Sequence, residues 1–206
     1  MKTILLHGLG QTPQDWQAVI SQASFSDIDC PWLFSPAKEH ITYSHILSEL
    51  EKRYASTTQP LCLCGLSLGA LLALDYTIRH GDNVASLILI GVQYKVPSRL
   101  IDFQNVLFRC MPKKVFENMG MTKNNIIQLS HSMRQLDFSN NLNNITCPTT
   151  IICGDRDKAN RKASKQLSRL LPQAELHIIP NAGHEINKCA PQAIATVLNK
   201  QHKIIQ

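Results

Sequence analysis

The chain has 206 residues, of which 44% are hydrophobic and 17% are charged, and its formal net charge is +6. These values fit one globular domain, or one domain with an insertion, and they exclude an intrinsically disordered chain. No apolar run is long enough to span a bilayer, and the short apolar stretch at the N-terminus stops at His7, too early for a signal peptide. We therefore expect a cytoplasmic protein.

The first half of the chain alternates between predicted strands and predicted helices. Apolar runs without helical periodicity predict buried strands at residues 2–6, 28–34, 61–64 and 84–90. Pro31 interrupts the second of these and weakens it. Helices are predicted at residues 13–21, 42–54 and 68–80. This alternation, with strands that are apolar throughout, is typical of a mostly parallel sheet covered by helices on both faces, which is an α/β fold.

The alternation breaks between residues 93 and 146, where the sequence shows helical periodicity and no clear strand. One helix is predicted by a stripe of apolar residues at helical spacing: Leu100, Phe103, Leu107 and Met111. Strands at 149–153 and 175–179 then resume the pattern, with helices at 160–171 and from Pro191 onward. We therefore predict a core made of residues 1–92 and 147–206 and a helical cap insertion at 93–146.

Two groups of residues have a plain structural interpretation. Cys62, Cys64 and Cys153 lie in predicted strands without the spacing of a zinc or redox motif, which favours buried free thiols. Five basic residues fall on one side of the helix at 160–171 or just before it, and we expect a solvated face there: Lys158, Arg161, Lys162, Lys165 and Arg169. The alternative is attraction of acidic substrates or nucleic acid. No aromatic residues interleave with the cluster, so we expect no nucleic-acid partner.

The segment Gly65-Leu66-Ser67-Leu68-Gly69 lies between a predicted strand and a predicted helix. So tight a turn forces strained backbone angles on the central serine, and the flanking glycines leave room where side chains would clash. The serine oxygen is then lifted above the sheet edge, beside the backbone donors of the helix N-terminus. The pattern predicts that Ser67 is a nucleophile. The alternative is a glycine-flanked turn with a helix-capping serine.

A serine nucleophile requires a histidine base that a carboxylate orients. His184 follows the last predicted strand, and loops after parallel strands open at the same sheet edge. Asp155 and Asp157 both follow the strand at 149–153 and both qualify by position as the acid, although Asp157 would also serve as a helix cap. Glu185 adjoins His184 in sequence, but neighbouring side chains rarely face each other suitably.

The first strand ends in His7-Gly8-Leu9-Gly10, whose glycines allow the backbone to approach a substrate closely. We expect the backbone amide of Leu9 to pair with that of Leu68 as an oxyanion hole. A simple strand-to-helix turn would explain the same four residues.

Four segments together resemble the α/β-hydrolase fold family: His7-Gly8-Leu9-Gly10 with Trp16 downstream, Gly65-Leu66-Ser67-Leu68-Gly69, Gly154-Asp155-Arg156-Asp157, and Asn181-Ala182-Gly183-His184 followed by Pro191. The order Ser67, Asp157, His184 is also that of the family. The resemblance covers most of the chain outside residues 93–146. It implies that Asp157, rather than Asp155, is the acid and that 93–146 is the family's lid or cap.

These observations predict a serine esterase that cleaves a carboxylic ester of a small or apolar substrate through an acyl-enzyme intermediate. Its triad would be Ser67, His184 and Asp157, with the amides of Leu9 and Leu68 as oxyanion hole and no metal or cofactor. Thioester, lactone or carbon–carbon bond hydrolysis on the same triad stays open, as does a non-catalytic ligand-binding role. We expect a small-molecule substrate as partner, and the oligomeric state stays open.

Overall fold

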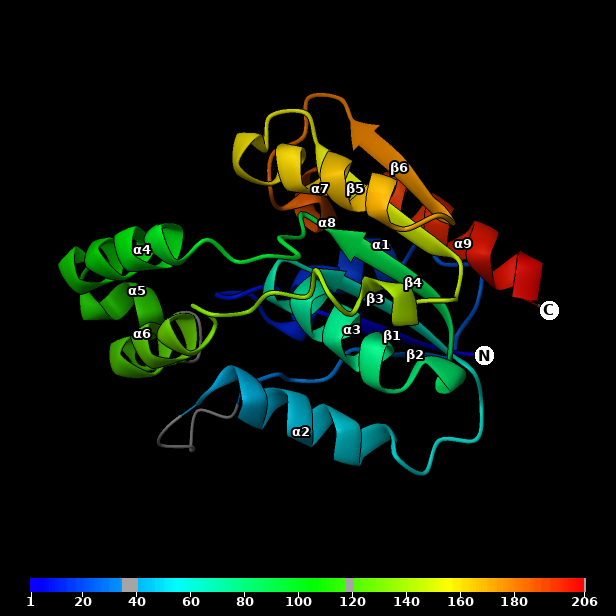
Figure 1. Cartoon of the computed structure of the whole chain (residues 1–206), viewed down its shortest axis with the longest axis horizontal. Coiled ribbons are helices and arrows are strands. Elements are labelled where there is room, and N and C mark those ends of the chain that lie inside the picture. The colour runs from blue at the N-terminus through cyan, green and yellow to red at the C-terminus, as the bar shows by residue number, and fades with distance from the viewer. Residues whose placement is uncertain (35–40, 118–120, 206) are drawn as a thin grey trace.

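The computed structural model describes residues 1–34, 41–117 and 121–205. At its centre lies a six-stranded sheet in the order β2-β1-β3-β4-β5-β6, in which every neighbouring pair is parallel (Figure 1). The strands are β1 (Lys2–Leu6), β2 (Ile28–Asp29), β3 (Leu61–Leu66), β4 (Val84–Ile90), β5 (Thr149–Gly154) and β6 (Ala174–Ile179). The predicted α/β fold is confirmed. Of the strand predicted at 28–34, only Ile28 and Asp29 form a strand, and Pro31 lies beyond its end.

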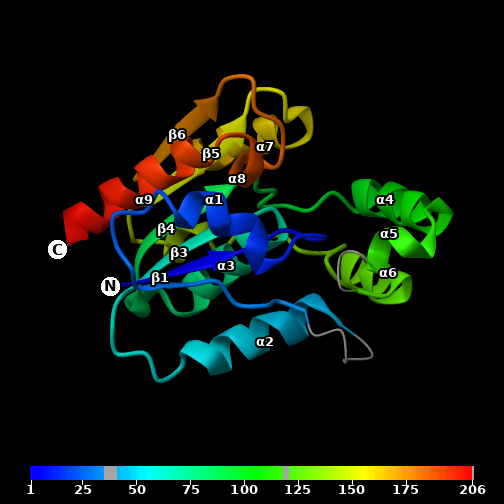
Figure 2. The same ribbon diagram turned by 180° about the vertical axis from the view of Figure 1, so that it is seen from behind.

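Helices cover both faces of this sheet. In front, as Figure 1 is viewed, lie α2 (Tyr43–Tyr54), α3 (Leu68–Arg79) and α7 (Lys158–Leu170). Figure 2 shows the opposite face, covered by α1 (Gln17–Ile20), α8 (Ile186–Cys189) and α9 (Pro191–Ile205). Three short 3₁₀ turns also occur in the described part of the chain: η1 (Pro13–Trp16), η2 (Gly81–Asn83) and η3 (Leu142–Asn144), the last of them within the segment 93–146. The predicted helix at 13–21 therefore begins as a 3₁₀ turn, with Pro13 in its first position.

Alternate strand residues supply two apolar clusters, one on each face of the sheet. In β3, Leu63 packs with the α2–α3 cluster, whereas Cys62 and Cys64 pack with the cluster around α1 and α9. Burial raises the pKa of Cys62 to about 11 and raises that of Cys64 well above its ordinary value, so both are neutral thiols. Cys153 in β5 is also a buried free thiol. The structural interpretation of all three is therefore confirmed.

The helices of the segment from 93 to 146 lie beyond the carboxyl ends of the strands, to one side of the sheet (Figures 1 and 2). They are α4 (Ser98–Cys110), α5 (Lys113–Glu117) and α6 (Lys123–Ser132). The last residues of the segment return along the front face, where η3 packs against α3. An isolated antiparallel bridge pairs Lys95 with Asp137 where the chain enters and leaves this segment. The Lys95 ammonium lies 2.8 Å from the Asp137 carboxylate, and this contact together with the hydrogen bonds from Ser139 lowers the pKa of Asp137 to about 2.

The helix predicted from the apolar stripe is confirmed as α4, but several of its apolar side chains are exposed. In α4, Phe103 and Leu107 do not face the protein interior; they are 62% and 48% exposed, and Ile101 is buried instead. Met111 is half-buried, and the side chain of Leu100 lies outside the described part of the chain. In α7, Leu170 is exposed, whereas Leu167 and the following Leu171 are buried. The five basic residues before Leu170 are all exposed, as expected.

Gly69 in the first turn of α3 sets how closely this helix approaches β1. A Cβ atom at this position would lie 2.0 Å from the Leu6 carbonyl oxygen, a backbone atom that has no room to move. We predict that Gly69→Ala lowers the free energy of unfolding by about 3 kcal/mol, because the helix must shift away from the strand. Urea denaturation measures the loss.

Gly183→Ala is the matched control, because a Cβ atom there meets nothing within 4 Å. Its denaturation midpoint should stay at the wild-type value. Equal midpoints for the two variants would contradict the proposed backbone contact.

Candidate active site

Ser67 is the single residue between β3 and α3. Its backbone angles, φ 55° and ψ −110°, lie in a region that non-glycine residues rarely occupy. The Ser67 N–H donates to the carbonyl of Ile90 in the neighbouring β4 at 2.9 Å, which fixes this strained turn to the sheet. The serine side chain is therefore presented at the carboxyl edge of the sheet, at the N-terminus of α3.

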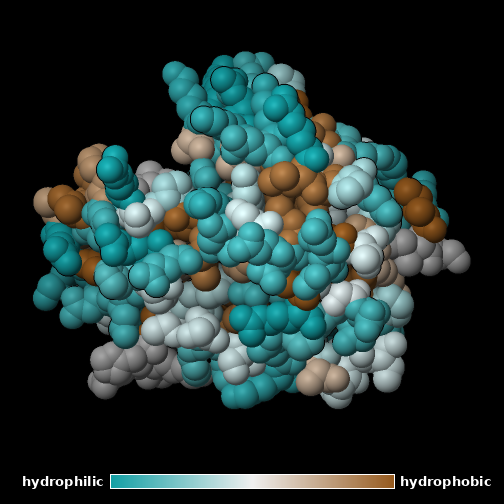
Figure 3. All heavy atoms as spheres, viewed as in Figure 1, coloured by the Kyte–Doolittle hydropathy of each residue, from teal (hydrophilic) through white to brown (hydrophobic). Residues whose placement is uncertain are grey.

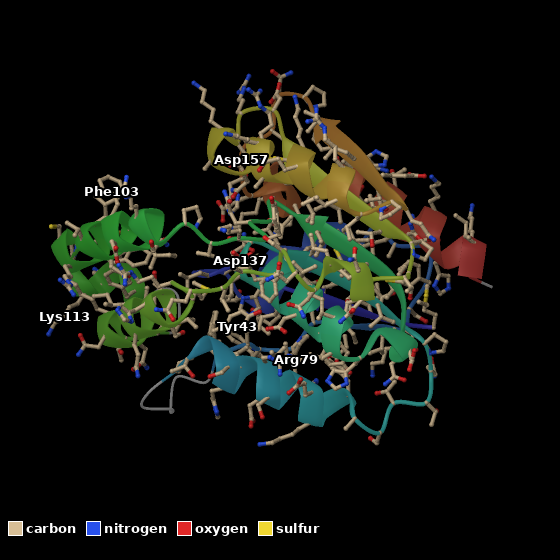
Figure 4. The ribbon with its side chains drawn as sticks, in the orientation of Figure 1. Tyr43, Arg79, Phe103, Lys113, Asp137 and Asp157 are labelled. Carbon is tan, nitrogen blue, oxygen red and sulfur yellow. The ribbon has the colours of Figure 1, made fainter. Side chains whose placement is uncertain are left out.

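His184 and Asp157 meet across the loops that follow β6 and β5. Nδ1 of His184 lies 2.7 Å from Oδ2 of Asp157, and the Asp157 side chain is only 5% exposed, whereas that of His184 is 39% exposed. Figure 4 shows Asp157 at the N-terminal end of α7. The carboxylate also caps this helix, since Oδ1 accepts from the N–H of Asn160 at 3.3 Å. Asp157 therefore both contacts His184 and caps α7, as its two interpretations from the sequence suggested. Asp155 is not the carboxylate that contacts His184.

Sequence reasoning missed Asn160, which lies three residues beyond Asp157. Its side-chain N–H₂ donates to both carboxylate oxygens of Asp157, at 3.0 and 2.8 Å. The same nitrogen lies 3.1 Å from Nδ1 of His184, but both atoms carry hydrogen when His184 donates to Asp157, so this contact is not a hydrogen bond. Polar residues in the first turn after a candidate acid are the signal that would have pointed to Asn160.

Asp157 keeps its negative charge at neutral pH. Burial would raise its pKa, but the hydrogen bonds from His184 and Asn160 outweigh burial and lower the pKa below its ordinary value. The carboxylate thereby holds the hydrogen on Nδ1 of His184 and leaves Nε2 as the nitrogen able to accept a proton.

Gly91, directly after β4, was also missed. Its φ is +57°, and a Cβ atom there would lie 2.9 Å from Cε1 and Nδ1 of His184 and 3.4 Å from the Asp157 carboxylate. A side chain at this position would therefore push the imidazole away from the acid. The sequence showed a glycine at the end of a strand, but it could not show that this glycine contacts His184, 93 positions later.

The loop after β1 is held by buried polar contacts. His7 is fully buried: Nδ1 donates to the carbonyl of Gly8 at 3.0 Å, and Nε2 accepts from the N–H of Leu33 at 3.2 Å. Burial lowers the pKa of His7, so the ring is neutral in this arrangement. His7 therefore shapes the backbone of the loop that carries Leu9.

A second contact joins this loop to the loop of His184. The side-chain amides of Gln11 and Asn187 exchange hydrogen bonds of 3.2 and 3.3 Å, and both residues are buried. Oε1 of Gln11 also accepts from the N–H of Gly8, and its Nε2 donates to Glu185. These contacts join two loops that lie about 175 positions apart in the sequence, so local sequence patterns could not reveal them.

Ser67 and His184 open into one cavity of about 200 Å³. Helices α4 and α6 contribute Ile101, Gln104 and Met133 to it. The full lining is Leu9, Ser67, Leu68, Leu71, Gly91, Gln93, Val96, Pro97, Ile101, Gln104, Met133, Ala159, Asn160 and His184. Apart from the imidazole, none of these side chains is ionisable. Leu9 and Leu68 thus line the same cavity as Ser67, as the predicted oxyanion hole requires.

No group of three or more His, Cys, Asp or Glu side chains suited to holding a metal ion occurs within residues 1–34, 41–117 and 121–205. In the same ranges, no helix is long and apolar enough to cross a membrane.

The chain is similar to known hydrolases in sequence and in structure. The family described as "Alpha/beta hydrolase family" matches residues 3–197. A stretch of 77 residues is 31% identical to RutD of Escherichia coli O26:H11 (strain 11368 / EHEC), a proposed carbamate hydrolase. This stretch covers 37% of the chain but only 29% of that relative.

Solved structures share its fold over almost the whole chain, and two of them illustrate the likeness. MenH from S. aureus superposes with a TM-score of 0.81 at 15% identity, covering 98% of this chain and 93% of MenH. The enol-lactonase from Burkholderia xenovorans LB400 gives a TM-score of 0.84 at 14% identity, covering 98% and 90%. At such low identity the likeness establishes the α/β-hydrolase fold and no particular activity.

The contacts of His7 predict a loss of stability in mild acid. Because the folded-state pKa lies below the ordinary value of 6.5, the unfolded chain takes up the proton first. The contribution of His7 to the free energy of unfolding is therefore fully present above pH 6.5 and is lost as the pH falls below it. The added proton would occupy Nε2, which now accepts from Leu33.

We expect this pH dependence to be weaker in His7→Gln when unfolding is followed by urea titration at several pH values. His131→Gln, at an exposed position on α6, is the control and should retain the wild-type pH dependence. An unchanged slope in His7→Gln would rule out this assignment.

Proposed function

The chain belongs to the alpha/beta hydrolase family, and we propose that it is a serine esterase that cleaves a carboxylic ester of a small or apolar substrate. The observation that supports this most directly is the 2.7 Å contact between Asp157 and His184, beside a cavity that Ser67 and His184 share. A strained serine, a histidine and a buried carboxylate in this order are the components of a nucleophilic triad.

In the proposed reaction, Oγ of Ser67 attacks the ester carbonyl while Nε2 of His184 accepts the serine proton. The imidazolium then gives this proton to the departing alcohol, and the acyl group stays on Ser67. A water molecule, deprotonated by the same nitrogen, attacks the acyl-enzyme, and Ser67 leaves with the proton as the free acid forms. Asp157 stays ionised throughout and stabilises the transient imidazolium, which agrees with its lowered pKa.

We assign the oxyanion hole to the amides of Leu9 and Leu68. Leu68 is the first residue of α3, and the first N–H groups of a helix have no partner within it. The N–H of Leu9 likewise meets no hydrogen-bond acceptor among the described residues. Each such donor contributes about 3 kcal/mol to stabilising the negative charge on the tetrahedral intermediate.

Residues 93–146 would serve as the cap, since α4 and α6 close the cavity opposite Ser67. The cavity volume of about 200 Å³ and its largely apolar, uncharged lining favour a short, uncharged acyl group. Thioesters, lactones and carbon–carbon bonds adjoining a carbonyl can be cleaved by the same kind of triad, and the relative RutD suggests carbamates as a further class. A ligand-binding role without turnover is the alternative outside catalysis.

The nucleophile is tested by labelling with a fluorophosphonate probe. Wild type should be labelled and Ser67→Ala should not, because the probe forms its bond with the serine oxygen. Asp157→Asn should reduce the rate of labelling and of ester hydrolysis by about 10⁴-fold, because an amide does not hold the required imidazole tautomer.

Asp155→Asn is the matched control, two residues away in the same loop, and should leave both rates close to those of wild type. Equal labelling of wild type and Ser67→Ala would reject the proposed nucleophile. Similar losses in the two aspartate variants would reject the assignment of Asp157. Ligand binding without any labelling would favour the non-catalytic role.

The size of the acyl group is tested with p-nitrophenyl esters of increasing chain length, alongside thioester, lactone and carbamate substrates. We expect the highest kcat/KM with short acyl chains. Met133 is buried at the end of α6 and lines the cavity, so Met133→Ala should raise kcat/KM for longer chains by about tenfold. Met111→Ala changes a methionine of the same segment outside the cavity and should not alter the preference. If Met133→Ala leaves the chain-length preference unchanged, the acyl group does not lie against Met133.

A further inference from the structure

The outer face of α4 carries an apolar stripe made of Phe103, Val106 and Leu107. These side chains are 62%, 54% and 48% exposed, and Val106 and Leu107 lie three and four residues after Phe103, on the same face of the helix. Only four other large hydrophobic side chains are comparably exposed in the described part of the chain, and they are scattered: Trp32, Leu170, Ile178 and Ile204. The α4 stripe is therefore a cluster of exposed apolar side chains on one helix. Figure 3 shows brown and tan atoms among hydrophilic ones at this end of the molecule.

The outer face of α4 is more apolar than that of an ordinary surface helix, although the inner face also buries Ile101. The inner face contributes Gln104 to the cavity and buries Asn105, whose Oδ1 has no hydrogen-bond partner among the described residues. The outer face, in contrast, presents the α4 stripe to water. Surface helices of globular proteins normally turn their apolar face inward. Contact of apolar side chains with water is unfavourable, so we expect the stripe to bind a second surface.

Positive charge surrounds the stripe. Arg99 and Arg109 are exposed on α4, and Lys113 and Lys114 are exposed on α5. Within the described residues, none of these four has a carboxylate within ion-pair distance. The only acidic residue of α4, Asp102, is paired with Arg134 at 2.9 Å. Figure 4 shows Phe103 and Lys113 at the same end of the molecule, away from the sheet.

The apolar stripe and the four cations around it together favour one kind of partner over others. A second copy docked about a two-fold axis would bring each group of cations close to its own counterpart, which is unfavourable. A neutral apolar partner would leave the four cations without counter-charges. An anionic lipid surface accepts apolar side chains at the depth of its headgroups and attracts Lys and Arg around them.

We propose that the α4 stripe, with Arg99, Arg109, Lys113 and Lys114, is a docking surface for anionic lipid bilayers. Docking inserts Phe103, Val106 and Leu107 among the headgroups and places the cations at the level of the lipid phosphates. The inner face of the same helix lines the cavity, so the cavity then lies close to the bilayer.

Cosedimentation with vesicles tests this proposal. Wild type should sediment with vesicles of equimolar phosphatidylcholine and phosphatidylserine, sediment much less with phosphatidylcholine alone, and be released by added salt. The double variant Phe103→Ser/Leu107→Ser should lower the partition coefficient by about tenfold or more, because two apolar side chains no longer leave water. Lys113→Glu/Lys114→Glu should lower it by a similar factor.

Two controls make the result specific. Ile204→Ser removes an apolar side chain that is 64% exposed on α9, far from α4, and should bind vesicles as wild type does. Ser67→Ala should also bind as wild type, so loss of activity and loss of docking are separate outcomes. All variants alter exposed positions, and circular dichroism checks their fold.

The proposal is overturned if wild type stays in the supernatant with anionic vesicles, or if Phe103→Ser/Leu107→Ser binds them as tightly as wild type. Light scattering tests the alternative that a second copy of the chain covers the stripe. A wild-type dimer that dissociates in the double variant, without vesicle binding, would assign the α4 stripe to self-association instead.

Discussion

The close contact between α3 and β1 is the constraint on which the rest of the site depends. The backbone of Gly69 lies so near the carbonyl of Leu6 that no side chain fits between them. This contact fixes the start of α3, and hence Ser67, relative to the end of the first strand. The loop that carries Leu9 begins directly after Leu6, so the proposed nucleophile and one proposed oxyanion donor are positioned by a single backbone contact.

A similar requirement holds where the acid and the histidine meet. Gly154 ends β5, and a Cβ atom there would lie 2.3 Å from the carbonyl oxygens of Ala182 and Gly183. The loop after β6 is therefore pressed against the end of β5, which brings His184 to Asp157. Since all six strands run parallel, each contributes its carboxyl end to the same edge, and backbone contacts there assemble a site from distant segments.

The sequence predicted features that depend on a short stretch of chain. Strand β4 was predicted to the residue, and Ser67 lies in the predicted turn with the expected strain. Asp155 and Asp157 could not be separated on position alone, because their difference lies in contacts with a loop that follows in the chain. The exposure of Phe103 could not be predicted for a related reason: periodicity identifies one face of a helix, but whether that face meets protein or water depends on the tertiary arrangement.

The electrostatics around His184 depend on residues that do not contact a substrate. Glu185 adjoins His184 in sequence, and a second carboxylate against the imidazole would compete with Asp157 for the hydrogen on Nδ1. Glu185 is instead bound by Gln11 at 2.9 Å and by the ammonium of Lys188 at 3.0 Å, and it does not line the cavity. The loops themselves are joined by neutral amides, Gln11 and Asn187, which add no charge near the imidazole. The arrangement therefore gives His184 one carboxylate partner while still holding the two loops together, which is the condition under which its Nε2 can act as a base.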